Sequence, residues 1–575
     1  MVAKVLAINE NTIIAAGLEN SHVGNLVRIG KDKIFGEIVS VSGKETSIQA
    51  YEDTNGIRIN DEMEDLNEPL SIELGPGLLT NIFDGLGRRL SALNSNFIAR
   101  GATLISLDRQ KKWSFKALKK KDDTVESGDV LGEVKETALI TTKILVPPGV
   151  RGKIIDISSG EFTVNQNIAE LKDPEGNSFK LNMIQKWPVR MPRPFRSKLN
   201  LHDPLLTGQR VFDTLFPIAK GGTVALPGGF GVGKTFLEHA FAKFSNTDIS
   251  IYVGCGERGN EMAEVLNSFP SVLDPHSGKS IMNKMVLIAN TSNMPIIARE
   301  ASIFTGITIA EFYRDMGYSV LLTADSTSRW AEALRELGSE MGEMPVEEGF
   351  PSSLFSSLAA FYSRAGVVDT LGTDKKSGSV TIIGAISPPG GDFSEPVTQT
   401  TARLADSYIE LDSKLAGERH YPPVNWTNSY SPLSGEIQQF YKKNIGPDFF
   451  TYVKKLLDLL HESDKINEIA SIVGREALPD KQAAILRLSD IAKLFFLQQN
   501  AFDEEDAYTP IEITYKMMNI LTSFIDKITS MIDSGAKYSD IKSNPIWERM
   551  SDLKHATALD KLEKDVNALG MGKTK

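Results

Sequence analysis

The eight residues from Gly228 to Thr235 read GGFGVGKT and fit the pattern G-x-x-x-x-G-K-[ST]. Glycines in this pattern let the backbone wrap around phosphate groups, so that successive N–H groups point at phosphate oxygens. The lysine, Lys234, neutralises the β- and γ-phosphates, and the hydroxyl of Thr235 can bind Mg²⁺. The pattern predicts a site for a nucleoside triphosphate with Mg²⁺, and its predicted phosphate-binding residues are Gly228, Gly229, Phe230, Gly231, Val232, Gly233, Lys234 and Thr235.

The residues on either side of this loop favour a phosphate site over a glycine-rich turn without a ligand. An apolar run, Thr223 to Leu226, precedes the loop and predicts a buried strand. Leu237, Ala240 and Phe241 follow at helical spacing. The phosphates would therefore lie at a helix N-terminus, where backbone N–H groups and the helix dipole favour negative charge.

A candidate for holding the metal is Asp325, which follows the apolar stretch SVLLTA. In nucleotide hydrolases, a carboxylate at the end of a neighbouring strand binds Mg²⁺, here through water. The next residues, Ser326 to Ser328, predict the N-terminal cap of a helix that contains Trp330. The alternative is that Asp325 only neighbours this cap. Arg329 faces either the phosphates or an acidic group, and the residues alone do not choose between the two.

A candidate base, Glu257, stands beside Arg258 in the stretch VGCGERGNEM. The preceding strand pattern, Ile249, Ile251 and Val253, brings Glu257 to the same edge of the sheet as the phosphate loop. A carboxylate there can orient and polarise an attacking water, and Arg258 can compensate its charge or contact a neighbouring subunit. The alternative is a solvated ion pair of Glu257 with Arg258. Both interpretations remain open from the residues alone.

Residues 187–433 predict a mostly parallel sheet covered by helices, which would bring side chains from separate parts of the chain together. Apolar strands alternate there with amphipathic helices. Ligands of such sheets bind beyond the carboxyl ends of the strands. The predicted strands are Thr223 to Leu226, Asp248 to Gly254, Met285 to Ala289, Tyr318 to Ala324 and Ser379 to Ile386.

The remaining regions have different patterns, and the chain is predicted to be multidomain. Short alternating strands at residues 1–70 predict a β-barrel, and residues 111–185 predict an inserted β-rich domain. Residues 71–110 and 186–435 then form the P-loop α/β nucleotide-binding domain. Helical spacing dominates residues 436–575 and predicts a C-terminal helical domain.

Composition limits the function classes. Among 575 residues, 63 Lys and Arg stand against 74 Asp and Glu, a net charge of -11 that argues against non-specific binding to a nucleic-acid backbone but leaves a local basic groove open. Cys255 is the single cysteine, which excludes an internal disulfide and fits a reducing cytosolic setting. No uninterrupted apolar run approaches the ~18 residues of a membrane span, so any membrane role is expected to belong to partners.

Several long motifs in a fixed order resemble one family over essentially the whole chain. They are ELGPGLL, QKWPVR, TGQRVFDTLFP, GGFGVGKT, YVGCGERGNEM, ADSTSRWAEALRE, GGDFSEPVTQ and LQQNAF. Together they resemble the catalytic A subunit of the A/V-type rotary ATPases. The resemblance implies a RecA-like nucleotide-binding domain in a ring of three A and three B subunits. ATP hydrolysis or synthesis at the A/B boundaries would be coupled to proton or sodium movement across a membrane.

The resemblance also implies partners and a location. Central stalk subunits D and F, peripheral stalk subunits E and G, and a membrane sector would join the A and B subunits on the cytoplasmic face of a membrane. The B subunit would supply an arginine finger, which is worth on the order of a thousandfold or more in rate. The chain alone should therefore be a poor ATPase.

Roles for single residues follow from matching the motifs. Glu257 corresponds to the carboxylate that activates water, and Lys234, Arg258 and Arg329 are the other catalytic residues implied. ATP or ADP with Mg²⁺ would bind, with Thr235 and Asp325 on the metal. The implied adenine-binding residues are Phe236, Tyr421, Ala501 and Phe502. From the residues alone, Tyr421 and Phe502 would be assigned to the core.

The sequence departs from the family pattern at four positions. Gly229 stands where proline is usual, and Val232 where a small residue is usual. Glu340 stands where arginine is common, and Val346 where glycine is common. Two other functions are alternatives: a nucleotide-binding subunit of the same ring that does not hydrolyse ATP, and a hexameric motor on nucleic acid, since some RNA-translocating helicases share this core. Retention of both Lys234 and Glu257 argues against the first, and the acidic net charge argues against the second.

Overall fold

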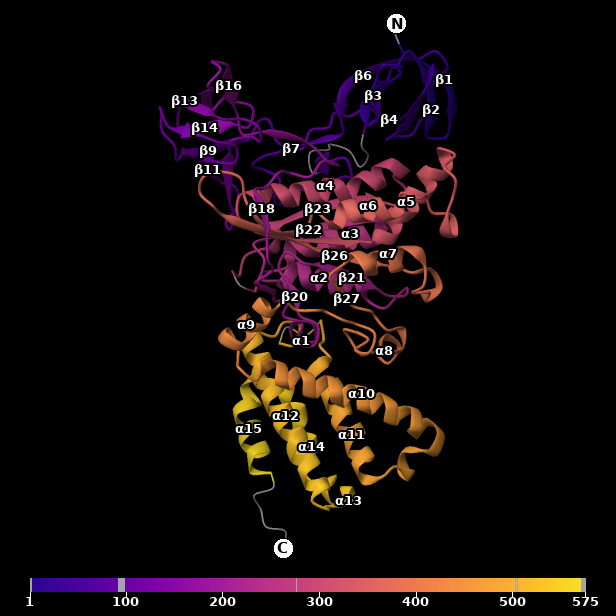
Figure 1. Ribbon diagram of the computed structural model, residues 1–575, viewed down its shortest axis with the longest axis vertical. Helices are drawn as coiled ribbons and strands as arrows, with labels where there is room; N and C mark the ends of the chain where they lie inside the picture. The colour runs from indigo at the N-terminus through magenta and orange to yellow at the C-terminus, as the bar shows by residue number, and fades with distance from the viewer. Residues whose placement is uncertain (1–2, 91–98, 276, 502, 504, 570–575) are drawn as a thin grey trace.

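The computed structural model describes residues 3–90, 99–275, 277–501, 503 and 505–569. In Figure 1 two β-rich parts lie at one end of the molecule, an α/β part in the middle and a helical part at the other end. The predicted fold class is confirmed. Among the described helices, none is both long enough and apolar enough to cross a lipid bilayer.

Six strands close into the N-terminal barrel in the order β1-β2-β5-β4-β3-β6. Apolar side chains that alternate along the strands with more exposed ones fill its interior. The buried side chains include Val5, Ile13, Val27 and Ile48. The strands are β1 Ala3–Asn9, β2 Thr12–Ala16, β3 Asn25–Ile29, β4 Ile34–Ser42, β5 Glu45–Ala50 and β6 Glu62–Pro69.

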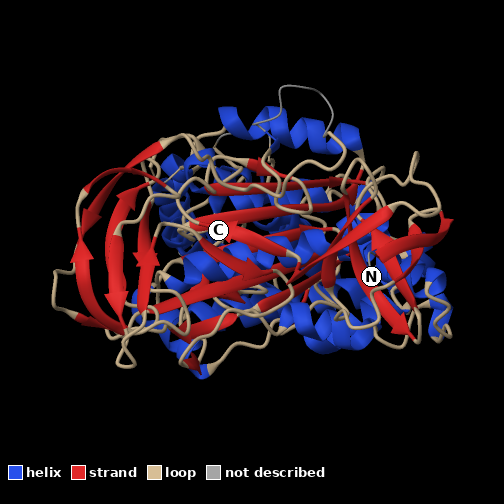
Figure 2. Cartoon of the chain, turned by 90° about the horizontal axis from the view of Figure 1, so that it is seen from above, coloured by secondary structure: helices blue, strands red, loops and turns tan. Residues whose placement is uncertain are grey.

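The predicted β-rich insertion consists of two four-stranded antiparallel sheets, β12-β11-β9-β14 and β10-β13-β15-β16. Figures 1 and 2 place it at the opposite side of the molecule from the barrel. Strands β7 (Ser71–Leu74) and β17 (Gln185–Pro188), which lie before and after the insertion in the sequence, pair with each other. The other strands are β9 Lys112–Ala117, β10 Thr124–Val125, β11 Val130–Lys135, β12 Thr141–Leu145, β13 Gly152–Ile157, β14 Gly160–Thr163, β15 Ala169–Lys172 and β16 Ser178–Leu181.

The centre of the molecule is a nine-stranded, mostly parallel sheet, as the alternating pattern predicts. Strand β26 pairs on one side with β24, followed by β22, β23 and β8, and on the other with β21 and the antiparallel β25. All five predicted strands are present. The bounds are β8 Ile82–Phe83, β18 Ser197–Leu199, β21 Thr223–Pro227, β22 Ile249–Glu257, β23 Met285–Thr291, β24 Ser319–Asp325, β25 Gly366–Asp369, β26 Ser377–Ile386 and β27 Ser407–Tyr408.

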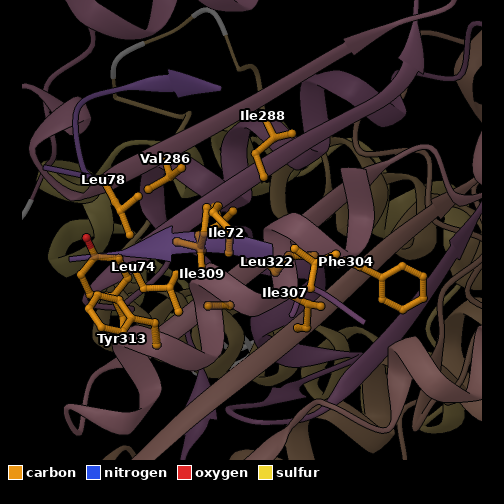
Figure 3. Close-up of a cluster of buried hydrophobic side chains, with 14 of the residues drawn as sticks. Ile72, Leu74, Leu78, Val286, Ile288, Phe304, Ile307, Ile309, Tyr313 and Leu322 are labelled. Carbon is orange, nitrogen blue, oxygen red and sulfur yellow. The ribbon is translucent and has the colours of Figure 1, made fainter. Parts of the chain in front are cut away.

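The core lies between this sheet and helix α4 (Ile296–Asp315), which is buried along nearly its whole length. Figure 3 shows Phe304, Ile307 and Ile309 of α4 near Leu322 of β24 and Ile72 of β7. Insertion residues such as Phe115 and Val134 belong to the same apolar cluster, so the insertion and the sheet share one core. The other elements of the middle part are α1 Arg210–Thr214, α2 Lys234–Phe244, α3 Gly259–Ser268, α5 Thr327–Glu340, α6 Leu354–Tyr362, α7 Pro396–Leu404, α8 Ser413–Gly417 and the short pair β19 Pro204–Leu205 and β20 Ile218–Ala219.

After Ser434 the described chain is helical and forms a bundle with a second apolar core. Leu456 and Leu460 of α10 are buried in this core with Leu521 and Phe524 of α12, each pair at the i, i+3 or i, i+4 spacing of one helix face. The helices are α9 Gly435–Asn444, α10 Phe449–Val473, α11 Asp480–Ile491, α12 Ile511–Asp533, α13 Tyr538–Ile541, α14 Ile546–Arg549 and α15 Leu559–Ala568.

One buried arginine, Arg210 of α1, joins the helical part to the α/β part. Its guanidinium donates to Gln498 O at 2.7 Å, to Asp506 Oδ1 at 2.8 Å and to Thr509 Oγ1 at 2.9 Å. All three acceptors lie between α11 and α12. The guanidinium is buried yet fully paired, and this segment is therefore fixed to α1.

Glu340, one of the four departures, contacts the barrel. Its Oε2 accepts hydrogen bonds from Gln49 Nε2 at 2.7 Å and from Thr12 Oγ1 at 3.0 Å. Glu340 is the last residue of α5, so this contact attaches the end of α5 to strands β2 and β5. An arginine could not accept these hydrogen bonds, because its side chain only donates.

Candidate active site

The phosphate loop joins β21 to α2 at the carboxyl end of the sheet, as predicted. Gly233 precedes α2 in the left-handed conformation, with φ of 86°, which side chains other than glycine rarely adopt. Lys234 Nζ donates to Gly228 O at 2.6 Å and to Gly229 O at 2.8 Å. The ammonium group thus holds the two ends of the loop together, while the side chain of Phe230 at its tip is 82% exposed.

Asp325, the last residue of β24, lies beside the loop. Its Oδ2 accepts hydrogen bonds from Thr235 Oγ1 at 2.9 Å and from Tyr252 OH at 3.1 Å. The hydroxyl and the carboxylate predicted for the metal are therefore in contact. Both offer the hard oxygen atoms that Mg²⁺ prefers, so the residues present fit this ion.

A metal at this position needs further ligands. Across the described residues, no group of three or more His, Cys, Asp and Glu side chains could hold a metal ion. Mg²⁺ commonly takes one or two protein groups together with substrate phosphates and water, and this fits the pair Thr235 and Asp325 beside a phosphate loop.

The predicted cap of α5 is wrong in one respect. Ser326 occupies the N-cap position, but its side chain accepts no hydrogen bond from the helix. Thr327 Oγ1 donates instead to Ala385 O at 2.9 Å, and Ser328 Oγ accepts from Ser387 N at 2.8 Å. The backbone at the end of the neighbouring strand β26 competes for these hydroxyls, so they attach α5 to the sheet.

Glu257 ends β22, next to β24, and follows a bulge in the strand pairing. Gly256, with φ of 72°, makes this bend. A Cβ at Gly256 would lie 2.9 Å from Arg299 Cδ, so the close packing also requires glycine. Burial is the main reason that the pKa of Glu257 rises to about 8, and the negative charges of Asp325 and Glu261 raise it further. Glu257 is thus a half-buried carboxyl group beside the loop.

The alternative of a solvated Glu257–Arg258 ion pair is wrong. Arg258 pairs with Glu261, at 4.0 Å, and its guanidinium lies 5.0 Å from the ring centre of Phe230. Strand β22 directs Glu257 inward, whereas Arg258 is the N-cap of α3 and points outward. The carboxyl group of Glu257 therefore lies at the site, while the guanidinium group of Arg258 faces the surface.

Arg329 lies on the first turn of α5 and pairs with Glu332 at 2.9 Å. Of the two orientations left open by the sequence, the structure shows the contact with an acidic group. Its positive charge still lowers the pKa of Glu257, although less than burial raises it. Arg329 therefore lies close enough to act on the site electrostatically.

Three of the four residues predicted to bind adenine lie within the described part of the chain. The ring of Tyr421 lies against Gly233, with Cε1 3.4 Å from the position of a Cβ there. Its side chain is 40% exposed, so the assignment of Tyr421 to the core is wrong. Phe236 is 54% exposed on the first turn of α2, and Ala501 is exposed. Phe502 lies outside the described residues.

Cys255 is buried, as expected of a small residue next to the Glu257 turn. Its thiol donates to Arg299 O and accepts from Ser302 Oγ, both at 3.4 Å. Burial raises the pKa of the thiol to about 12. A thiol with this pKa is almost wholly protonated at neutral pH, and the thiolate is the reactive form.

We expect Cys255 to resist thiol reagents in the folded chain. At pH 8 with excess 5,5′-dithiobis(2-nitrobenzoate), labelling should be near zero thiols per chain before unfolding and one per chain in denaturant, since the sequence has one cysteine. Fast labelling of the folded chain would show that the turn before Glu257 is open to solvent.

Glu238 is a site residue that the sequence reasoning missed. It lies on α2, four residues after Lys234 and three after Thr235, a spacing that places all three on one side of the helix. Its side chain is 0% exposed and its carboxyl group lies against Asp325. Its spacing of four residues from Lys234 and three from Thr235 is the sequence signal that could have indicated it.

The fold and the loop define a P-loop nucleotide-binding protein with an N-terminal barrel and a C-terminal helical domain. Family models match all of these parts. The "ATP synthase alpha/beta family" models match residues 208–431 as nucleotide-binding domain and 3–67 as beta-barrel domain. The "ATPsynthase alpha/beta subunit barrel-sandwich domain" matches 104–190, and the "C-terminal domain of V and A type ATP synthase" matches 438–542.

Curated relatives match over nearly their full length. The chain is 47% identical to the "V-type ATP synthase alpha chain 2" of Clostridium tetani, over 96% of this chain and 94% of that protein. It is also 47% identical to the A subunit of the A-type ATP synthase of Desulfurococcus sp. (strain SY), over 98% of this chain and 97% of the relative. The chain belongs to the family of A-type and V-type ATP synthase A subunits.

A solved structure agrees in fold. The assembled ATPase EscN of the type III secretion system of enteropathogenic E. coli is 22% identical, with a TM-score of 0.64, over 90% of this chain and 99% of that chain. At this identity the likeness shows the fold alone.

Proposed function

We propose that the chain is the catalytic subunit of an A/V-type rotary ATPase, which hydrolyses or synthesises ATP and couples this to proton or sodium transport across a membrane. One observation carries the proposal. Lys234, Asp325 and Glu257 come from three separate segments and meet beside the phosphate loop. Binding alone would require the lysine, whereas a half-buried carboxyl group with a raised pKa, Glu257, fits a group that accepts a proton.

In the proposed mechanism, Lys234 and the backbone N–H groups of the loop bind the β- and γ-phosphates. Thr235 and Asp325 hold Mg²⁺, which when bound neutralises the charge of the phosphate oxygens. Glu257 orients the attacking water and accepts its proton. Arg258 and Arg329 act as further positive charges at the edge of the site, and Phe236, Tyr421, Ala501 and Phe502 hold the adenine.

The outward orientation of Arg258 and the exposed tip of the loop support a site that a second chain completes. We propose that this second chain is the B subunit, which alternates with the present chain in a ring of three and three. Its arginine finger would face the phosphates. The proposed assembly also contains central stalk subunits D and F and peripheral stalk subunits E and G, and lies on the cytoplasmic face of a membrane whose sector the partners provide.

Reconstitution with the B subunit tests this proposal. The chain alone should hydrolyse Mg-ATP slowly, and adding the B subunit should raise the rate by about a thousandfold or more, the range of an arginine finger. The B subunit by itself is the control. A complex that binds ATP without turnover would support the non-hydrolysing subunit instead. Stimulation of the ATPase by single-stranded RNA would support the nucleic-acid motor.

A further inference from the structure

Glu238 is a buried carboxyl group to which the proposed mechanism gives no part. No described residue donates a hydrogen bond to Oε1 or Oε2, although the side chain is fully buried. A buried polar group without a partner costs on the order of 1–3 kcal/mol, and more when it is charged. A cation bound to the carboxylate would offset this cost.

The surroundings of Glu238 show which kind of ligand it fits. Its carboxyl group lies against that of Asp325, and two ionised carboxylates cannot hydrogen-bond to each other because both only accept. The contact between two carboxyl groups is therefore unfavourable unless a cation or a proton separates them.

The charges at this point do not balance when all groups are ionised. Glu238, Glu257 and Asp325 carry three negative charges, and Lys234 supplies one positive charge. Thr235 Oγ1, bonded to Asp325 at 2.9 Å, adds a neutral oxygen to the same group. A divalent cation would supply the two missing positive charges and would take oxygen ligands of these kinds.

We propose that Glu238 is a further residue of the divalent cation site, which helps Asp325 and Thr235 to hold Mg²⁺ beside the phosphate loop. This inference rests on the proposed function, because it concerns the metal of the same nucleotide site. Glu238 would set how tightly the cation is held, through its negative charge and its oxygen atoms, and would not contact the attacking water.

Substitution of Glu238 by glutamine removes the charge and keeps the shape. With ADP present, in the complex with the B subunit, we expect Glu238→Gln to weaken Mn²⁺ binding by roughly tenfold, the low end for groups that support a metal site. Electron paramagnetic resonance of free Mn²⁺ measures this affinity. ADP affinity in EDTA, measured by titration calorimetry, should remain unchanged.

Two comparisons make the result specific. Glu264→Gln removes a carboxylate from the exposed side of α3 and should leave Mn²⁺ binding unchanged. Glu238→Asp keeps the charge and should bind Mn²⁺ more tightly than Glu238→Gln does, and it remains informative if the glutamine variant fails to fold. Mn²⁺ affinities equal to that of the wild type in the folded Glu238 variants would overturn the inference. A wild-type complex that binds neither ADP nor Mn²⁺ would instead overturn the proposed function.

Discussion

Replacing Glu257 with glutamine should stop ATP turnover in the reconstituted complex and leave nucleotide binding close to that of the wild type. Glutamine has nearly the same shape but cannot accept a proton from water. A positioned base contributes about 10²–10⁴-fold to a rate, so kcat should fall at least about a hundredfold. Steady-state hydrolysis measures the loss, and calorimetric titration with ADP measures the binding.

The raised pKa of Glu257 gives this prediction a pH dependence. A base works in its ionised form, and the ionised fraction of Glu257 rises as the pH increases through about 8. Because kcat/KM reports groups of the free enzyme, it should climb with pH towards that value and then level off. The Glu257→Gln variant should lack this rise. Turnover at the wild-type rate in that variant would exclude Glu257 as the base.

Lys234→Ala should weaken the binding of ATP itself. The substitution removes a charged donor to the phosphates, and hydrogen bonds to charged groups are worth about 1.5–3 kcal/mol, which corresponds to roughly a tenfold to hundredfold rise in Kd. It also removes the bonds to Gly228 O and Gly229 O, so the loop loses the group that joins its two ends. Calorimetric titration of the complex with ATP measures the change.

Lys243→Ala is the matched control for this substitution, because Lys243 lies at the other end of the same helix. It should leave the Kd for ATP within about twofold, since this half-buried lysine lies nine residues beyond Lys234 and the influence of a charge falls off with distance. If Lys234→Ala and Lys243→Ala bind ATP equally well, the loop is not the phosphate site.

The architecture could be predicted because local patterns determine it. The strands before the loop, before Asp325 and before Glu257 are each mostly apolar, and parallel strands bring such ends to one edge. The glycines of GGFGVGKT indicate the loop by their backbone freedom. These features depend on short segments, so a single sequence reveals them.

Contacts between distant segments could not be predicted. The ion-pair partner of Arg258 depends on the direction in which β22 ends. The hydrogen-bond partners of the Thr327 and Ser328 hydroxyls lie at the end of the neighbouring strand β26, which begins about 50 residues later in the sequence. The place of Glu238 in the site could not be predicted, because it depends on a contact with Asp325, a residue far away in sequence. A pattern within one helix does not show what that helix packs against.

The Arg210 contacts have a mechanical consequence. The segment that they hold, from Gln498 to Thr509, joins α11 to α12 and also supports Tyr421, because Gln499 N donates to Tyr421 O at 2.8 Å. A tilt of these helices relative to the sheet must therefore either carry the wall next to Gly233 along with it or break buried hydrogen bonds. A tilt of the bundle would thus be transmitted to this wall through the guanidinium of Arg210 together with neighbouring buried hydrogen bonds, such as that from Gln209 Nε2 to Ala507 O at 2.7 Å.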